Sequence, residues 1–176
     1  MNKDNKIQAF EYLLSKLVEW NDNVTTKDND ISVLKALKLL FFVSAVGTTK
    51  SSEGTLLDDV FSNFAAMPYG HVESDIYSII RSGGLKGATV DNSKTTILES
   101  FNPALIASED KIRIDKSIEA LKVINPNLIT KSAFDLVELS HSWYSWKYYF
   151  ARAKKNSTLR EFIPSEIIKA EEKIYF

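Results

Sequence analysis

The sequence predicts a mainly α-helical protein, a single compact multi-helix domain over residues 1–176. Three observations favour this fold class. The length of 176 residues is typical of one domain with a sizeable core. Apolar residues make up 44% of the chain and charged residues 26%, which is ordinary for a globular protein. The segment at about residues 33–46 is apolar on nearly every side, so we expect it to be the buried central helix.

The first half of the chain reads as helices separated by short polar loops. Apolar side chains at helical spacing predict a first amphipathic helix at roughly residues 6–20. Asp30 or Ser32 can cap the central helix, which should end at Gly47. A short helix is predicted at 56–64 and another at 73–81. Pro68 and Gly70 break the chain between these two helices.

The second half adds a region with strand character and two longer helices. Residues near 86–99 favour a small β-hairpin, with an ordered loop as the alternative. A short extended piece is expected at 111–114, followed by a helix that Asp115 caps. The next helix should run over 133–154 with a break near 140–142, where three short polar side chains compete for backbone hydrogen bonds. Pro164 precedes a last helix at 165–174.

The stretch Leu136–Phe150 concentrates aromatic residues. It contains two of the three tryptophans and one of the two histidines, with its large side chains on one helical face. So much aromatic surface must line a core, a partner surface or a groove. Composition and spacing leave these three alternatives open.

Charge and composition narrow the classes of partner and compartment. The formal net charge is −1, so nucleic acid or anionic lipid would need a local basic patch. There is no cysteine, which excludes disulfides and thiolate metal sites and fits a reducing compartment. The longest strongly apolar run, at 39–46, is too short to span a membrane, and no signal-peptide pattern is present. We therefore expect a cytoplasmic protein with no cofactor.

Two alternative functions arise from the residues themselves. His71 and His141, with a nearby carboxylate, could form a metal-dependent enzyme or ligand-binding site, although two hydrogen-bonded structural histidines are the simpler interpretation. The basic stretch Lys147–Arg160, beside several aromatics, could bind single-stranded nucleic acid. The simpler interpretation there is an amphipathic helix with solvated cations near its C-terminus.

Four segments, in this order, resemble the Panacea-type antitoxin domain, the SocA-like family often labelled phage-associated in bacterial genomes. They are Leu34–Ala45, which includes the motif lysine Lys38; Phe64–Tyr77, with its turn Tyr69-Gly70-His71-Val72; Leu136–Trp146, with Ser140, His141, Trp143 and Trp146; and Phe162–Ile168. The chain departs from the family pattern at a few positions. His71 and Ser145 stand where proline is usual, Ser140 replaces threonine, and Phe41 or Phe42 stands in for tyrosine.

The resemblance implies a non-catalytic domain that neutralises a cognate toxin by direct binding, with a protease or chaperone as a further partner. It implies no enzymatic activity. We interpret the Ser-His-x-Trp-x-x-Trp pattern as a structural clasp on the turn, in which His141 donates a hydrogen bond to a turn carbonyl and a tryptophan covers it. The residues that bind the partner would then be ones outside the apolar helix faces, which we expect to be exposed. The candidates are Met67, Tyr69, Tyr144, Lys147 and Arg152.

Overall fold

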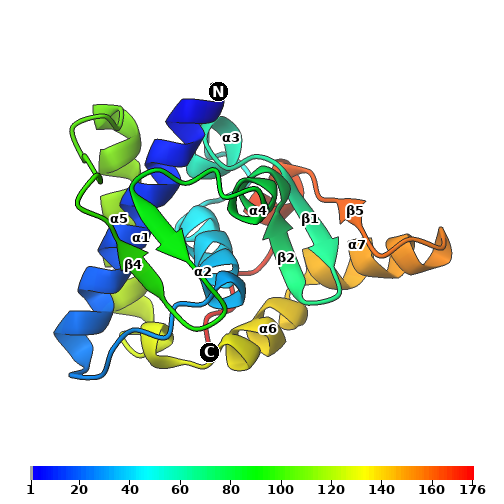
Figure 1. The fold of residues 1–176 in the computed structure, drawn as a ribbon. Helices are drawn as coiled ribbons and strands as arrows, with labels where there is room; N and C mark the ends of the chain where they lie inside the picture. The colour runs from blue at the N-terminus through cyan, green and yellow to red at the C-terminus, as the bar shows by residue number, and fades with distance from the viewer. Residues whose placement is uncertain (1) are drawn as a thin grey trace.

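The protein is mainly α-helical, as the sequence predicts, in a computed structural model that describes residues 2–176 (Figure 1). The helices are α1 (Lys3–Val24), α2 (Val33–Ala45), α3 (Leu56–Asp59), α4 (Ser74–Arg81), α5 (Ser108–Ile124), α6 (Ala133–Ser142), α7 (Tyr144–Lys155) and α8 (Ser165–Ala170), with a 3-10 turn at Leu128–Thr130. Strands β1 (Phe64–Met67), β2 (Gly70–Glu73) and β5 (Glu161–Phe162) form an antiparallel sheet in the order β2-β1-β5. A separate hairpin joins β3 (Ala88–Val90) to β4 (Thr95–Ile97).

Helix α2 is the central element, as predicted. The Ser32 hydroxyl caps it by accepting the Lys35 backbone N–H, and every residue from Lys35 to Ala45 is buried. Figure 1 shows α2 in the middle of the molecule, with α1 and α5 on one side and the β1–β2 hairpin on the other. An apolar helix needs such surroundings, because each of its faces must be covered.

Helix α5 corrects one prediction. The residues at 111–114 are not extended, and Asp115 does not cap a helix, because α5 already begins at Ser108. Ile114, Ile118 and Leu121 are fully buried at helical spacing. Because this apolar face packs on the core, residues 111–114 are helical and not extended. The Asp115 carboxylate accepts a hydrogen bond from the Tyr12 hydroxyl at 2.7 Å, which ties α5 to α1.

The segment from 56 to 72 corrects a second prediction. The helix expected at 56–64 ends at Asp59, and the residues around Pro68 form a β-hairpin. Its register pairs Met67 with Gly70, so Pro68 and Tyr69 are the turn. Strand β1 is almost wholly buried, with alanines at its centre. It therefore lacks the alternating pattern that identifies a half-exposed strand.

The second hairpin and the break in the long helix are present as predicted, whereas the last helix is shorter than predicted. The hairpin at 88–97 is present, and the predicted break in the long helix falls at Trp143, whose backbone is extended between α6 and α7. Helix α8 ends at Ala170 instead of continuing to 174. The Lys173 ammonium accounts for this end, since it binds the exposed carbonyls of Ile168, Lys169 and Glu171.

Within residues 2–176, no helix is long and apolar enough to cross a membrane.

Candidate functional site

The site is built where the β1–β2 hairpin lies against the corner between α6 and α7. Gly70 has φ +93°, a conformation that side chains other than glycine rarely adopt. A Cβ at this position would lie 2.4 Å from the Ser140 hydroxyl oxygen and 3.1 Å from Lys38 Nζ. Glycine is thus needed at residue 70 for two reasons: the positive φ of the turn and the close approach of Ser140 on α6.

His71 follows Gly70 and is completely buried. Its Nδ1 lies 2.8 Å from Ser140 Oγ and its Nε2 lies 2.7 Å from Ser145 Oγ, so both ring nitrogens have a hydroxyl partner. The ring stacks on Phe41 of α2 with centroids 3.7 Å apart. Burial lowers the pKa of His71 well below its usual range, with the positive charge of Lys38 a smaller cause, so the ring is neutral.

Three buried polar residues, His71, Ser140 and Ser145, are joined through the His71 ring. The ring and the Ser145 hydroxyl form a hydrogen bond of 2.7 Å. Ser140 contacts the same ring and also accepts the His71 backbone N–H at 3.0 Å. These three residues form one polar cluster, because each buried polar group supplies a hydrogen-bond partner for another.

Lys38 of α2 completes the interior of the site. Its side chain is fully buried and donates to the His71 carbonyl oxygen. Among residues 2–176 no carboxylate lies within ion-pair distance of its ammonium. Burial lowers the pKa of Lys38 to about 7, so at neutral pH a substantial fraction of this amine is uncharged.

His141 and Trp146 hold the outer side of the turn, as predicted for the clasp. His141 Nε2 lies 3.1 Å from the Pro68 carbonyl oxygen, and a carbonyl only accepts, so Nε2 carries the proton. Trp146 donates its indole N–H to the Met67 carbonyl at 2.8 Å. The two rings stack with centroids 3.7 Å apart. Burial lowers the pKa of His141, which the Pro68 hydrogen bond partly opposes.

Trp143 and Glu171 join the α6–α7 corner to the C-terminal segment of the chain. Trp143 is fully buried and donates its indole N–H to the Ile174 carbonyl at 2.9 Å. The Glu171 carboxylate accepts the Ser145 backbone N–H at 2.9 Å and so caps α7, whose own N-cap residue, Trp143, has no side-chain acceptor. Burial raises the pKa of the Glu171 carboxyl.

The two histidines do not share a ligand site. His71 is enclosed between α2 and the α6–α7 corner, whereas His141 lies outside the turn. The carboxylates near His71 in the sequence are engaged elsewhere: Lys6 Nζ lies 2.6 Å from both Glu73 and Asp75. Within residues 2–176, no group of three or more His, Asp or Glu side chains is arranged to hold a metal ion.

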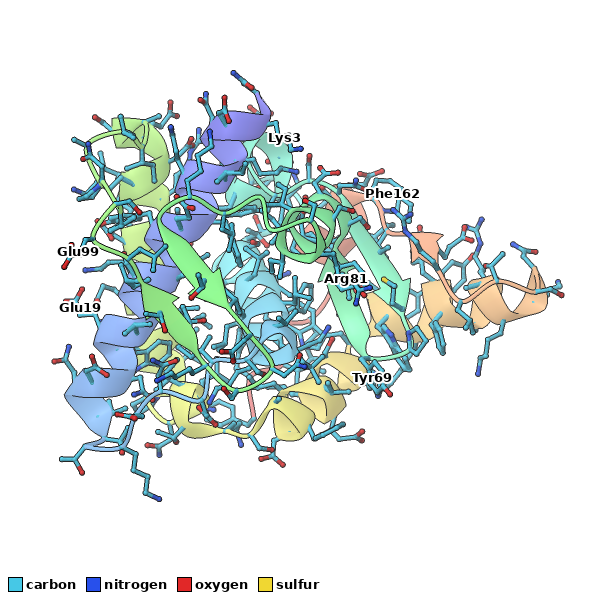
Figure 2. All side chains as sticks on the ribbon, viewed as in Figure 1. Lys3, Glu19, Tyr69, Arg81, Glu99 and Phe162 are labelled. Carbon is cyan, nitrogen blue, oxygen red and sulfur yellow. The ribbon has the colours of Figure 1, made fainter. Side chains whose placement is uncertain are left out.

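An apolar groove lies beside the hairpin turn and is lined by the turn itself, the first half of α2, α4 and the end of β3. It has a volume of about 580 Å³. Its lining residues are mostly apolar: Val33, Leu34, Leu37, Met67, Pro68, Tyr69, Val72, Tyr77, Ile80 and Val90, with Arg81, Asp91 and Asn92 at polar positions. Figure 2 shows Tyr69 at the tip of the hairpin. We call this the hairpin groove.

A second cleft of about 590 Å³ lies beside α1 and α4 and is polar. Its lining includes Lys3, Lys6, Asp75 and three serines. Glu73 and Asp75 already neutralise Lys6 there, so the cleft offers a weaker basis for a binding site than the hairpin groove.

The predicted partner-binding residues fall on two surfaces. Met67 and Tyr69 line the hairpin groove, while Tyr144, Lys147 and Arg152 lie on the outer face of α7. Tyr69 and Tyr144 are each 59% exposed, as expected, but Met67 is half-buried because its strand packs against α7. The sequence did not single out Leu34, Tyr77 or Ile80, because a half-buried groove residue and a core residue have the same helical spacing.

Comparison with known proteins finds no matching family model, no matching curated protein and no matching solved structure.

Replacing Gly70 by alanine should cost more than a positive φ alone explains. Gly47 is the matched control, because it also has a positive φ, +69°, with nothing within 4 Å of an added Cβ. We expect a loss of about 1 kcal/mol in unfolding free energy for Gly47→Ala and about 2–4 kcal/mol for Gly70→Ala, which also meets Ser140. Urea unfolding of both variants measures the difference. Equal losses would contradict the close approach.

Lys38 makes stability depend on pH in a defined direction. The folded-state pKa of about 7 lies below the usual value of about 10.4. Because the unfolded chain binds this proton more tightly, lysine opposes folding fully below pH 7, and the penalty disappears as the pH rises toward 10. The unfolding free energy of the native protein relative to Lys38→Met should therefore rise by about 1.4 kcal/mol per pH unit above pH 7.

Urea unfolding of both proteins between neutral and alkaline pH measures this slope. The control is Lys116→Met, at an exposed position, whose difference from the native protein should stay flat. A flat difference for Lys38→Met as well would mean that the buried amine keeps its proton.

His71 and Ser145 should be energetically coupled. Each alanine variant leaves the other side chain with an unpaired buried polar atom, whereas the double variant removes both. A double-mutant cycle with His71→Ala and Ser145→Ala should give an interaction energy of about 1–3 kcal/mol from urea unfolding. The reference pair, Ser145→Ala with the distant Tyr12→Phe, should be additive within about 0.5 kcal/mol. Additivity of the first pair would show that the hydrogen bond contributes nothing.

Proposed function

We propose that this chain is a non-catalytic protein-binding module, an antitoxin that neutralises a cognate toxin by direct binding. The observation that supports it best is the convergence of three motif segments on one turn. Lys38 comes from the first, Gly70 and His71 from the second, and Ser140, His141 and Trp146 from the third. Residues that resemble one family's motifs thus serve one common purpose, which is to hold the hairpin.

The buried half of these groups favours a structural role over a catalytic one. His71, Ser140, Ser145 and Lys38 are all completely buried, and the hydroxyl and imidazole groups bind one another. A catalytic group must reach its substrate, and these groups line neither the hairpin groove nor the polar cleft. Their effect on function is then to position Tyr69 and Met67.

The hairpin groove is the docking surface of this proposal. Its occupant is an apolar segment of the toxin that carries an acidic residue. Asp91 on the rim is already bound by the Ser93 and Lys94 backbone N–H groups, whereas Arg81 makes no ion pair within the part of the chain that the structure describes. Arg81 is therefore the groove's cation available to a carboxylate of the ligand, and an apolar lining with one such cation suits an apolar segment that carries an acidic residue.

A substitution at the tip of the groove tests the proposal. Tyr69→Asp places a charge in the groove, and because Tyr69 is 59% exposed, the unfolding free energy should change by less than about 0.5 kcal/mol. Toxin affinity should fall at least roughly 30-fold, the loss expected for a central aromatic contact. The matched control is Val123→Asp on α5, at a position 84% exposed and away from the groove.

The partner to use is the product of the reading frame beside this gene. Its expression should arrest growth, and co-expression of the native chain or Val123→Asp should restore growth, whereas Tyr69→Asp should not. Titration calorimetry with the purified proteins gives the affinities. A neighbouring product that is neither toxic nor bound would overturn the function. Full rescue by Tyr69→Asp would move the docking surface away from the groove.

A further inference from the structure

The strongest charge asymmetry in the molecule lies on α7 and the loop that follows it. Residues 144–160 contain five of the 22 basic side chains and none of the 23 acidic ones. The rest of the chain therefore carries a formal charge of −6. Figure 1 shows that α7 and this loop project from the body of the molecule, with β5 running back along them. We call residues 144–160 the basic arm.

The outer face of the arm combines these cations with exposed tyrosines. The rings of Tyr144 and Tyr148, which are 59% and 46% exposed, stack one helical turn apart with centroids at 5.7 Å. Arg152 continues the same row, and its guanidinium lies 6.0 Å from the Tyr148 ring. The inner face packs on the hairpin through Trp146 and Phe150, so the row points to solvent.

The row is held in place before any partner arrives. Arg152 lies 3.2 Å from the Glu161 carboxylate on β5 and 5.4 Å from the Tyr149 ring. A guanidinium held in an ion pair and two stacked rings lose little side-chain freedom on binding, and Tyr and Arg are, with Trp, enriched among central contacts of protein interfaces. The arm is therefore a preorganised surface.

The positive charges of the basic arm indicate that its partner is acidic. Lys147, Lys154, Lys155 and Arg160 make no ion pair within residues 2–176, and in this part of the chain Glu161 is the only carboxylate within ion-pair distance of an arm cation. An acidic segment would satisfy these cations, and tyrosine hydroxyls can donate to its carboxylates. Leu159 in the loop after α7, 65% exposed, adds apolar surface beside these cations. Phe162 on the adjacent strand β5, 52% exposed and labelled in Figure 2, adds more.

A protein segment fits better than a nucleic acid. The tyrosine rings stack on each other and under Arg152, so fewer ring faces are free for bases to stack on. The acidic body would also repel a phosphate backbone that extends beyond the arm. We propose that the basic arm is a second interaction surface, separate from the hairpin groove, that binds a protein segment bearing clustered carboxylates interspersed with aromatic side chains.

Fluorescence anisotropy with defined probes tests this binding on the purified full chain. The main probe is a fluorescein-labelled peptide of alternating glutamate and phenylalanine, compared with a glutamate–serine peptide and a single-stranded DNA of matched length. We expect the glutamate–phenylalanine peptide to bind at least several-fold more tightly than either comparison probe, with an affinity that falls as salt is raised. Tighter binding of the DNA would make the arm a nucleic-acid site and overturn the proposal.

Variants of the arm then locate the binding. Lys147→Gln combined with Lys155→Gln should weaken peptide binding at least roughly tenfold, and Tyr148→Ala should remove the preference for phenylalanine. The matched control, Lys27→Gln with Lys116→Gln, removes two exposed cations elsewhere and should change affinity less than twofold, within ordinary error. Equal effects of the two pairs would show that only net charge matters. Because no toxin is used, this outcome is independent of the proposed antitoxin function.

Discussion

The missing side chain at residue 70 is the constraint on which the site depends. Because Gly70 has no Cβ, Ser140 of α6 can lie against the hairpin backbone and accept the His71 N–H. The same proximity brings the Lys38 amine to the His71 carbonyl and leaves the Pro68 and Met67 carbonyls within reach of His141 and Trp146. These contacts hold the backbone on either side of Tyr69 and join the hairpin to the corner from which α7 starts.

The interior of this site is held together by polar groups that pair with one another. The buried His71–Ser145 hydrogen bond joins the hairpin to the first turn of α7 by direct contact, at the cost of burying polar groups that must stay paired. Ser140 of α6 is the third member of this cluster, because its hydroxyl lies against the other nitrogen of the His71 ring.

The parts of the fold that sequence could predict are those set by local patterns. The periodicity of α2 and the polar residues before Trp143 indicate a central helix and a helix break, and both are present. The β1–β2 hairpin could not be predicted this way, because its alanine-centred strand is buried on both faces and its pairing with β5 joins residues far apart in the chain. For the site, helix-breaking residues indicated the His141 contact with the turn. Nothing in the spacing indicated that Lys38 is buried, since a lysine on an apolar helix usually extends to solvent.

The burial of Lys38 has a consequence for the thermodynamics of folding itself. An unfolded lysine is protonated at neutral and mildly alkaline pH, whereas the folded amine, with its pKa of about 7, gives up much of that proton. Folding above pH 7 is therefore also an acid–base reaction with the solution, in which the buffer takes up what the core expels. The heat that accompanies folding must then include the buffer's own enthalpy of ionisation, so a calorimeter would record different values in phosphate and in Tris for the same conformational change.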